Sequence, residues 1–205
     1  MLGGHWRIWK QQHNADHHMH TNIDGHDGDI ALGIIARIHP NQKRYWWHTY
    51  QHIYLPLFIY PISYFAWIYI LDFQKARRMK WGALDYLTLI FSKCIHISLF
   101  VVFPLFFRSL SEVVIGYAIV LAVTGTVTSF VFQLAHVVEI TEMVDATEEI
   151  THDEIHQLKT TANFATNNKF LSWYVGGLNF QREHHLYYKI SHVHYPEINL
   201  AVKKV

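Results

Sequence analysis

The chain has 205 residues, enough for one domain, and is unusually apolar, with 51% hydrophobic and 16% charged residues against roughly 25% charged in an average soluble protein. Its formal net charge of +1 gives no reason to expect nucleic-acid binding. The single cysteine, Cys94, excludes an intramolecular disulfide and a multi-cysteine zinc site, and is expected to be a small apolar filler. Histidine is the outlier, with 17 residues, as many as lysine and arginine combined.

The first histidine cluster, HNADHH, lies within residues 5–22, which we expect to be largely helical. It contains His13, His17 and His18. Positions i and i+4 of a helix lie on one face, so two of these imidazoles can converge while the third reaches over the edge of that face. Neutral imidazole is a common metal ligand that suits iron, zinc and copper. The spacing therefore predicts half of a metal site.

An Asp/Gly-rich loop is expected at residues 24–29, directly after this helix. Carboxylates at that place could orient ligand imidazoles, as outer partners of metal-binding histidines often do. A solvated loop, whose aspartates form turns with their own backbone, is the favoured interpretation for each of them. The three aspartates are Asp24, Asp27 and Asp29.

Residues 40–52 mix basic and aromatic side chains, a mixture typical of the membrane–water interface. Their histidines, His48 and His52, are spaced like a pair of ligands. No third histidine stands nearby in the sequence, so interfacial or core roles are favoured for both.

Three apolar stretches follow, at 53–71, 86–107 and 113–132. A bilayer core of about 30 Å requires about 20 helical residues, so each is long enough to cross. If the first histidine cluster and a second one near the C-terminus build one site, the chain must cross the membrane an even number of times between them. The basic run KARRMK prefers the cytoplasmic side, which favours 86–107 and 113–135 as the crossing hairpin and leaves 53–71 re-entrant or interfacial. The alternative that pairs 53–71 with 113–135 stays open.

His136 ends the last apolar stretch, at the expected membrane boundary, where an ionisable residue is a functional candidate. On spacing alone, an interfacial histidine is an equal alternative. The next segment, 139–162, is rich in acidic residues and is expected to be a soluble helix. It includes His152 and His156 at i, i+4 spacing, and an exposed helical face is the favoured interpretation for this pair.

The second cluster follows a short helix, a loop and a glycine turn expected over residues 160–180. Gln181, His184 and His185 fall at i, i+3 and i+4 and would share one face of a helix. Many nitrogen ligands without thiolates disfavour structural zinc sites and iron–sulfur clusters. A histidine-rich dinuclear iron site is the best physical match, although zinc and copper fit the spacing too.

These motifs resemble the membrane fatty acid desaturase family, and most of all its bacterial front-end branch of linoleoyl-CoA or delta-6 type. HNADHH followed by TNIDG resembles the family's second histidine box. FQREHHLYY resembles the third box, with Gln181 in place of its first histidine. QLAHVVE and TTANFA resemble the same branch, and the similarity covers essentially all 205 residues.

The resemblance implies an all-α integral membrane protein with a cytoplasmic, histidine-rich cap that holds two iron ions. Four further histidines receive no ligand role: His20 and His26 fall where the family more often has other residues, and His192 and His194 are expected to position the chain. The implied ligands are His13, His17, His18, His136, His184 and His185, with Gln181 as a weak or outer partner.

The family's first histidine box, HxxxH or HDxxH, is not found before His13, and neither is an earlier pair of membrane helices. The resemblance therefore implies that residues 1–205 are an N-terminally incomplete desaturase domain. HDEIH has the letters of the first box but follows the second, so the role is not transferred to His152 or His156.

The implied reaction is the O2-dependent insertion of a cis double bond into the acyl chain of an acyl-CoA or acyl lipid. Electrons would come from an external donor of ferredoxin or cytochrome type. No side chain is a strong enough oxidant for an unactivated methylene, so a metal centre must activate O2. Three alternatives stay open: a related lipid hydroxylase or sphingolipid-type desaturase, an inert truncated membrane fragment that lacks two iron ligands, and a histidine-rich metal carrier.

Overall fold

The computed structural model describes residues 3–30, 32–38, 40–145 and 153–204. Within these ranges the regular structure is helical, and the strand-like pairing is limited to an isolated parallel bridge between Ile23 and Val144. The all-α prediction is therefore confirmed. The chain divides into two compact units, Met1–Asn14 with Tyr50–Ser129 and Ala15–Thr49 with Phe130–Val205.

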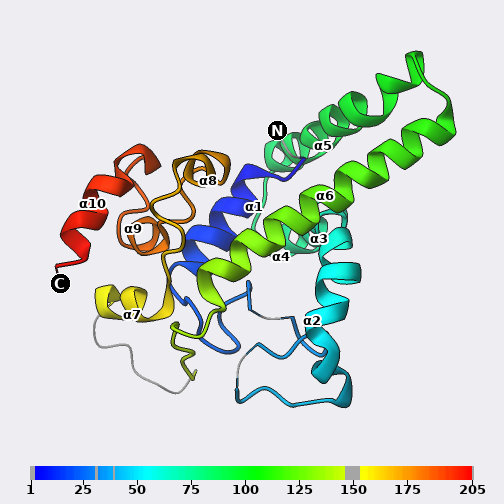
Figure 1. Cartoon of the computed structure of the whole chain (residues 1–205). Coiled ribbons are helices and arrows are strands. Elements are labelled where there is room, and N and C mark those ends of the chain that lie inside the picture. The colour runs from blue at the N-terminus through cyan, green and yellow to red at the C-terminus, as the bar shows by residue number, and fades with distance from the viewer. Residues whose placement is uncertain (1–2, 31, 39, 146–152, 205) are drawn as a thin grey trace. The chain divides into compact units, whose positions relative to one another are not determined.

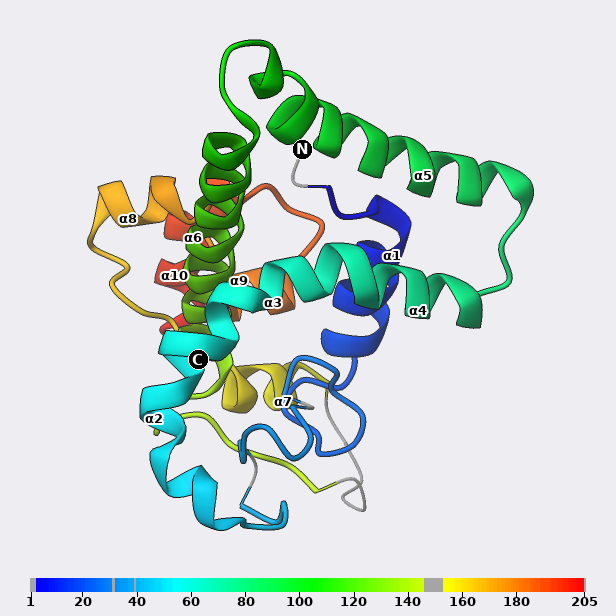
Figure 2. The same ribbon diagram turned by 90° about the vertical axis from the view of Figure 1, so that its right-hand side faces the viewer.

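The first unit contains an N-terminal helix and two long helical runs that alternate between α, π and 3-10 segments. Its elements are α1 (Trp6–Lys10), α2 (Gln51–Tyr54), η3 (Leu55–Ile59), α3 (Tyr60–Ala66), η4 (Trp67–Leu71), α4 (Asp72–Arg78), α5 (Ala83–Ile97), η5 (Ser98–Val102) and η6 (Pro104–Phe106). Figure 2 shows the continuous helical path from α2 through α3 to α4. Three elements extend over the boundary between the units: η1 (Gln11–His17), η2 (Trp46–Tyr50) and α6 (Leu110–His136).

Among the described residues, three helices are long and apolar enough to cross a membrane: Trp46–Arg78, Ala83–Phe106 and Leu110–His136. In the most apolar 18 residues of each helix, only 22%, 17% and 17% are buried within the chain. Such exposed apolar surfaces fit lipid rather than water. The stretch 53–71, which was expected to be re-entrant or interfacial, lies in the helix Trp46–Arg78, which has 33 residues. Length therefore does not set it apart, and which stretches cross stays a prediction.

The hairpin of α5 and α6 ends in a short turn (Figure 1). Cys94, on α5, is exposed and not the packed filler that its type predicted. The physical reason is its place on the outer surface of an apolar helix, where an apolar side chain can face lipid without a protein core.

A small core of the first unit joins α1, α4 and α5 through Ile8, Ala76 and Leu89, all buried. Elsewhere in this unit, α6 approaches α3 closely at Gly125. A Cβ atom at Gly125 would lie 2.3 Å from the carbonyl oxygen of Tyr60, so only glycine allows this contact.

The second unit consists of short helices linked by loops. Its elements are α7 (Asp153–Thr160), α8 (Lys169–Tyr174), α9 (Gln181–Leu186), η7 (His192–His194) and α10 (Tyr195–Val202). Helix α9 contacts both α7 and α10. The short helix and the glycine turn expected over 160–180 are present, but the loop lies before the helix and not after it. Gly176 and Gly177 have φ of 61° and 79°. These values lie in the left-handed region that favours glycine.

The acidic helix expected over 139–162 is only partly correct. Residues 153–160 are helical, whereas 139–145 form turns and the bridge to Ile23. The hydroxyl of Thr141 donates to the carbonyl oxygens of His136 and Val138, at 2.7 and 2.8 Å, and so competes with continued helix. Residues 146–152, with Glu148, Glu149 and His152, lie outside the described residues.

Candidate metal centre

The helix predicted over 5–22 ends earlier than expected, at His17, the last residue of η1. The Thr21 hydroxyl donates to the His17 carbonyl at 3.0 Å, and Asn22 follows with a left-handed φ of 57°. Asparagine tolerates this conformation better than most residues. After this turn the chain returns to the histidines at Asp27, whose carboxylate lies beside Nδ1 of His17.

Asn22 joins three segments of the second unit through one buried side chain. Its Nδ2 lies 2.9 Å from the carbonyl oxygen of His136, 3.1 Å from that of Glu142 and 3.0 Å from that of Thr160. The side chain thus connects the end of α6, the loop after it and the end of α7. These contacts hold the three segments together next to His136.

Replacing Asn22 with alanine is expected to lower the free energy of unfolding by about 1–3 kcal/mol, since buried carbonyls lose their donor and alanine is strained at this φ. Thermal unfolding in detergent measures the effect. Asn167→Ala, in an exposed turn, is the matched control. Equal unfolding temperatures for the wild type and Asn22→Ala would contradict the role of this residue.

Three buried histidines of the second unit converge: His17 from the end of η1, His136 from the end of α6 and His185 from α9. The Nε2 atoms of His17 and His136 are 3.2 Å apart. One ring nitrogen from each of the three lies within 4.8 Å of the others. Their exposed fractions are 1%, 3% and 5%. We call these three the histidine triplet. Such a set of converging imidazoles is the donor arrangement that iron, zinc or copper accepts.

The orientation of His185 fits a metal ion. Its Nδ1 lies 2.8 Å from Oε1 of Gln157, whose own Nε2 donates to the His18 carbonyl at 2.6 Å. Nδ1 therefore carries the proton, and the lone pair lies on Nε2. That Nε2 atom is buried and has no hydrogen-bond partner among the described residues. A buried acceptor without a donor is costly unless a cation occupies the place in front of it.

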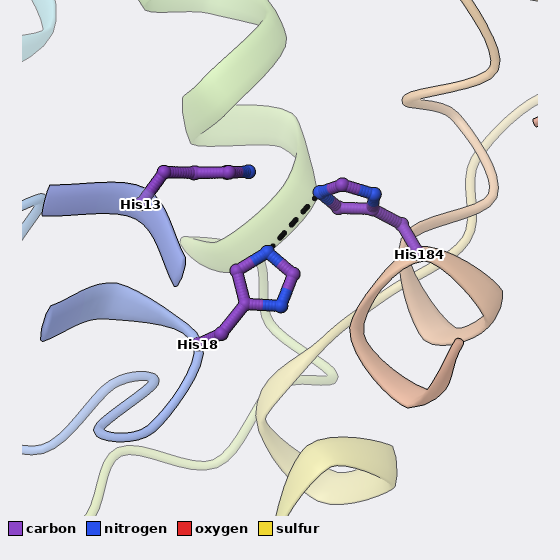
Figure 3. A group of neighbouring side chains, drawn as sticks. All are labelled: His13, His18 and His184. Atoms are coloured by element: carbon purple, nitrogen blue, oxygen red, sulfur yellow. Dashed lines mark hydrogen bonds between the residues drawn. The ribbon is translucent and has the colours of Figure 1, made fainter. Parts of the chain in front are cut away.

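A second histidine pair, His18 and His184, lies in the same unit. Their Nε2 atoms are 3.2 Å apart, and Figure 3 shows the two rings meeting at these atoms. The ring of His18 also stacks on His185, with 4.1 Å between the ring centroids. Nδ1 of His184 is 3.3 Å from the hydroxyl of Tyr195 on α10. His17 and His18 of the second box thus lie in the same unit as His184 and His185 of the third box.

Two other predicted ligands have different surroundings. Figure 3 also draws His13, which η1 carries four residues before His17 and which belongs to the first unit. It is buried there, and its ring stacks on Trp9 with 4.6 Å between centroids. Gln181 is buried at the start of α9, and its Nε2 donates to the carbonyl of Leu178 at 2.7 Å.

Burial keeps several of these imidazoles neutral. Burial, together with neighbouring histidines, lowers the pKa of His18 to about 3 and that of His184 to about 4. The same causes hold the pKa of His185 well below its usual range. For His17, burial is the largest single influence and opposes the charge, but the hydrogen bond to Asp27 and the negative charges of Asp29 and Asp27 together outweigh it and raise the pKa. Neutral imidazoles can offer lone pairs to a metal at physiological pH.

Asp27 corrects the interpretation of the acidic loop. Its carboxylate is completely buried, with oxygens 3.0 and 3.1 Å from Nδ1 of His17. It also accepts the backbone N–H groups of Asn22 and Asp29, both at 2.9 Å. These donors offset the cost of burying the charge. A solvated loop is therefore wrong for Asp27, which instead orients a triplet histidine, whereas Asp24 binds the side chain of Gln42.

Two residues that sequence reasoning missed complete the surroundings. Gln157 orients His185, as described, and Glu183 is completely buried in α9. The Glu183 carboxylate accepts from the side chains of Asn163 and Asn199, both at 2.7 Å. Asn163 lies in the TTANFA motif, so this motif was the available signal.

Replacing Gln157 with leucine is expected to weaken metal binding about 10–100-fold, the usual effect of losing a group that orients a ligand. Leucine has a similar size but cannot accept the hydrogen bond from Nδ1 of His185. Cobalt(II) titration, followed by visible absorption, measures the affinity. Glu154→Leu on the exposed side of α7 is the control. Unchanged affinity in Gln157→Leu would show that this hydrogen bond does not matter.

The remaining histidines divide clearly. The expectation of an exposed face is wrong for His156, which is buried because α7 packs this side against α9 while residues 153–155 face outward. His48 is buried, and its Nε2 lies 3.0 Å from the carbonyl of Ile34, in agreement with a core role. His20 and His26 stack on each other with 5.5 Å between centroids.

Comparison with known proteins agrees with this arrangement. The family model for fatty acid desaturase matches residues 1–205. An sn-1 linoleoyl-lipid 6-desaturase of Arthrospira platensis is 39% identical to this chain, and the alignment covers 93% of this chain and 55% of that protein. A protein of the same name from Synechocystis is 36% identical, over 97% of this chain and 58% of the relative.

A probable Delta(5) fatty acid desaturase C of Dictyostelium discoideum is 30% identical over 100% of this chain and 48% of its own length. The chain thus spans about half the length of the curated relatives it matches. No solved structure matches it. From its histidine motifs, its apolar helices and the family match over its whole length, the chain belongs to the fatty acid desaturase family, in the front-end bacterial branch.

Proposed function

We propose that this chain forms part of an O2-dependent acyl desaturase with two iron ions bound by histidines. The histidine triplet is the observation that carries the proposal. Three buried nitrogen donors come from three separate helices and lie within 4.8 Å of one another. His185 presents a buried lone pair that no described donor satisfies. Family membership supports iron over zinc or copper.

In this proposal His17, His136 and His185 hold one iron ion, and His18 and His184 contribute to the second. His13 and Gln181 enter from the family resemblance alone, as a ligand and a weak outer partner. The domain is proposed to be N-terminally incomplete at residues 1–205, with further ligands from a first histidine box.

Bound iron would supply the oxidising power that amino-acid side chains lack, by activating O2. The protein's own part is to hold the imidazoles oriented and away from water. Burial keeps His18 and His184 unprotonated at neutral pH. Asp27 fixes the ring of His17, and Gln157 fixes that of His185. Oriented ligands of this kind keep a metal site ready for reaction.

The proposed substrate is the acyl chain of a membrane lipid. Two relatives are named for sn-1 linoleoyl-lipid desaturation, which favours an acyl lipid over an acyl-CoA. Three apolar helices provide the membrane setting that such a substrate needs. The electron donor is proposed to be an external protein of ferredoxin or cytochrome type. The metal site is proposed to lie on the cytoplasmic side, which the basic run at 75–80 favours.

Lipid analysis tests the function. Cells expressing the complete reading frame that contains this chain are compared with cells expressing its His185→Ala variant, by gas chromatography of their acyl chains. One additional cis double bond, present only with the wild type, is expected. Hydroxylated chains would favour the hydroxylase alternative. An unchanged profile from iron-loaded protein, with electron donor and O2 supplied, would contradict the proposal.

A further inference from the structure

A buried ion pair lies between two apolar helices of the first unit. Nζ of Lys93 on α5 is 2.5 Å from Oδ2 of Asp72 on α4, and the two side chains are 7% and 1% exposed. Removing two such charges from water is costly, and apolar replacements are often equally stable. Ionisable groups within membrane helices are therefore candidates for function rather than for stability.

Both charges also bind the backbone of the segment that leads into α1. Lys93 Nζ donates to the carbonyl of Gly3 at 2.5 Å, and Asp72 accepts the backbone N–H of His5 at 3.1 Å. The approach is close, because a Cβ atom at Gly3 would lie 2.8 Å from Cγ of His96, and Gly3 has a left-handed φ of 81°. Backbone atoms cannot change rotamer as side chains can. These two hydrogen bonds therefore fix the position of residues 3–5 along the axis of α1.

Further contacts hold the same helix along its length. Arg7 of α1 forms an ion pair with Asp85 at the start of α5. Ile8 is buried in the core between α4 and α5. On η1, Gln12 accepts a hydrogen bond of 2.5 Å from Lys75 of α4. The segment from Gly3 to Gln12 is therefore bound to α4 and α5 from end to end.

We propose that the Asp72–Lys93 pair is a positioning device that sets where α1 and η1 present His13. Helix α1 continues directly into η1, which carries His13 one residue after Gln12. A metal ligand must be placed within about 0.2 Å of its ideal distance. A buried pair that holds backbone at the start of the helix meets this demand better than an apolar contact, which permits sliding. This inference rests on the proposed function of His13 as an iron ligand.

Cobalt(II) titration of the full-length protein in detergent tests the inference. Lys93→Met and the double variant Lys93→Met/Asp72→Leu remove the pair, and the double variant leaves no buried unpaired charge. We expect at least one metal-binding event to weaken about 10–100-fold in both, as for lost orienting groups. Tyr69→Phe is the matched control, since it breaks a polar contact between apolar helices, to Tyr117, that does not touch residues 3–14.

A double-mutant cycle with His13→Ala separates positioning from general loosening. If the pair acts through His13, Lys93→Met/Asp72→Leu adds little to the loss that His13→Ala causes alone. Additive losses would overturn the inference, and so would wild-type affinity in the folded double variant. If Lys93→Met does not fold, the double variant gives the answer. Failure of the wild type to bind cobalt would instead count against the proposed function.

Discussion

The His185→Ala variant is expected to lose metal binding at the histidine triplet and, with it, all desaturation. The ring of His185 lies 5.0 Å from that of His17, 4.9 Å from that of His136 and 4.1 Å from that of His18, centroid to centroid. Its removal leaves two nitrogen donors and a cavity. The expected loss of affinity exceeds about 100-fold, the upper end for groups that only orient a ligand.

The chain provides a closely matched control for this variant. His156 is buried to a similar extent, at 7% exposed against 5% for His185, and lies in the same unit. It is in none of the candidate metal groups found among the described residues. His156→Ala should therefore keep bound metal, as measured by elemental analysis of purified protein. Equal metal content in the two variants would contradict the assignment of His185.

Asp27→Asn is expected to have the second largest effect, because an amide cannot replace this carboxylate. The oxygens of Asp27 accept from Nδ1 of His17 and from the backbone of Asn22 and Asp29. An amide turns an N–H group toward one of these donors and leaves buried groups unsatisfied, at about 1–3 kcal/mol. The ring of His17 also loses its fixed orientation, so metal affinity should fall about 10–100-fold.

Two measurements separate these consequences. Thermal unfolding of metal-free protein reports the lost hydrogen bonds, and cobalt(II) titration reports the lost orientation of His17. Asp24→Asn is the control from the same loop, since Asp24 is partly exposed and binds the side chain of Gln42. If both variants bind cobalt equally well, Asp27 does not orient a ligand.

The sequence predicted the histidines of the site because ligand spacing along a helix is local information. It could not show that Asp27 is buried, since that depends on the left-handed turn at Asn22 and on carbonyls from distant segments. Gln157 was missed for a similar reason. The acidic composition predicted an exposed helix. In the structure, Gln157 lies on a buried face of α7, whereas residues 153–155 are exposed.

The apolar helices were predicted by hydropathy, but the buried ion pair between Asp72 and Lys93 was not. Asp72 directly follows the uncharged stretch 53–71, so a linear reading assigns it to the water boundary. Its partner Lys93 lies 21 positions later on another helix. Only the register between α4 and α5 brings the two charges together, and sequence spacing does not define that register.

Metal analysis of the full-length protein tests the central claim most directly. Protein purified without added metal and then loaded anaerobically with Fe2+ should hold two iron ions per chain, and His136→Ala should reduce this number, while His156→Ala should not. X-ray absorption at the iron edge should show imidazole nitrogen and no sulfur around the iron. Bound zinc without an iron pair, or full iron content in His136→Ala, would contradict a di-iron site built on the histidine triplet.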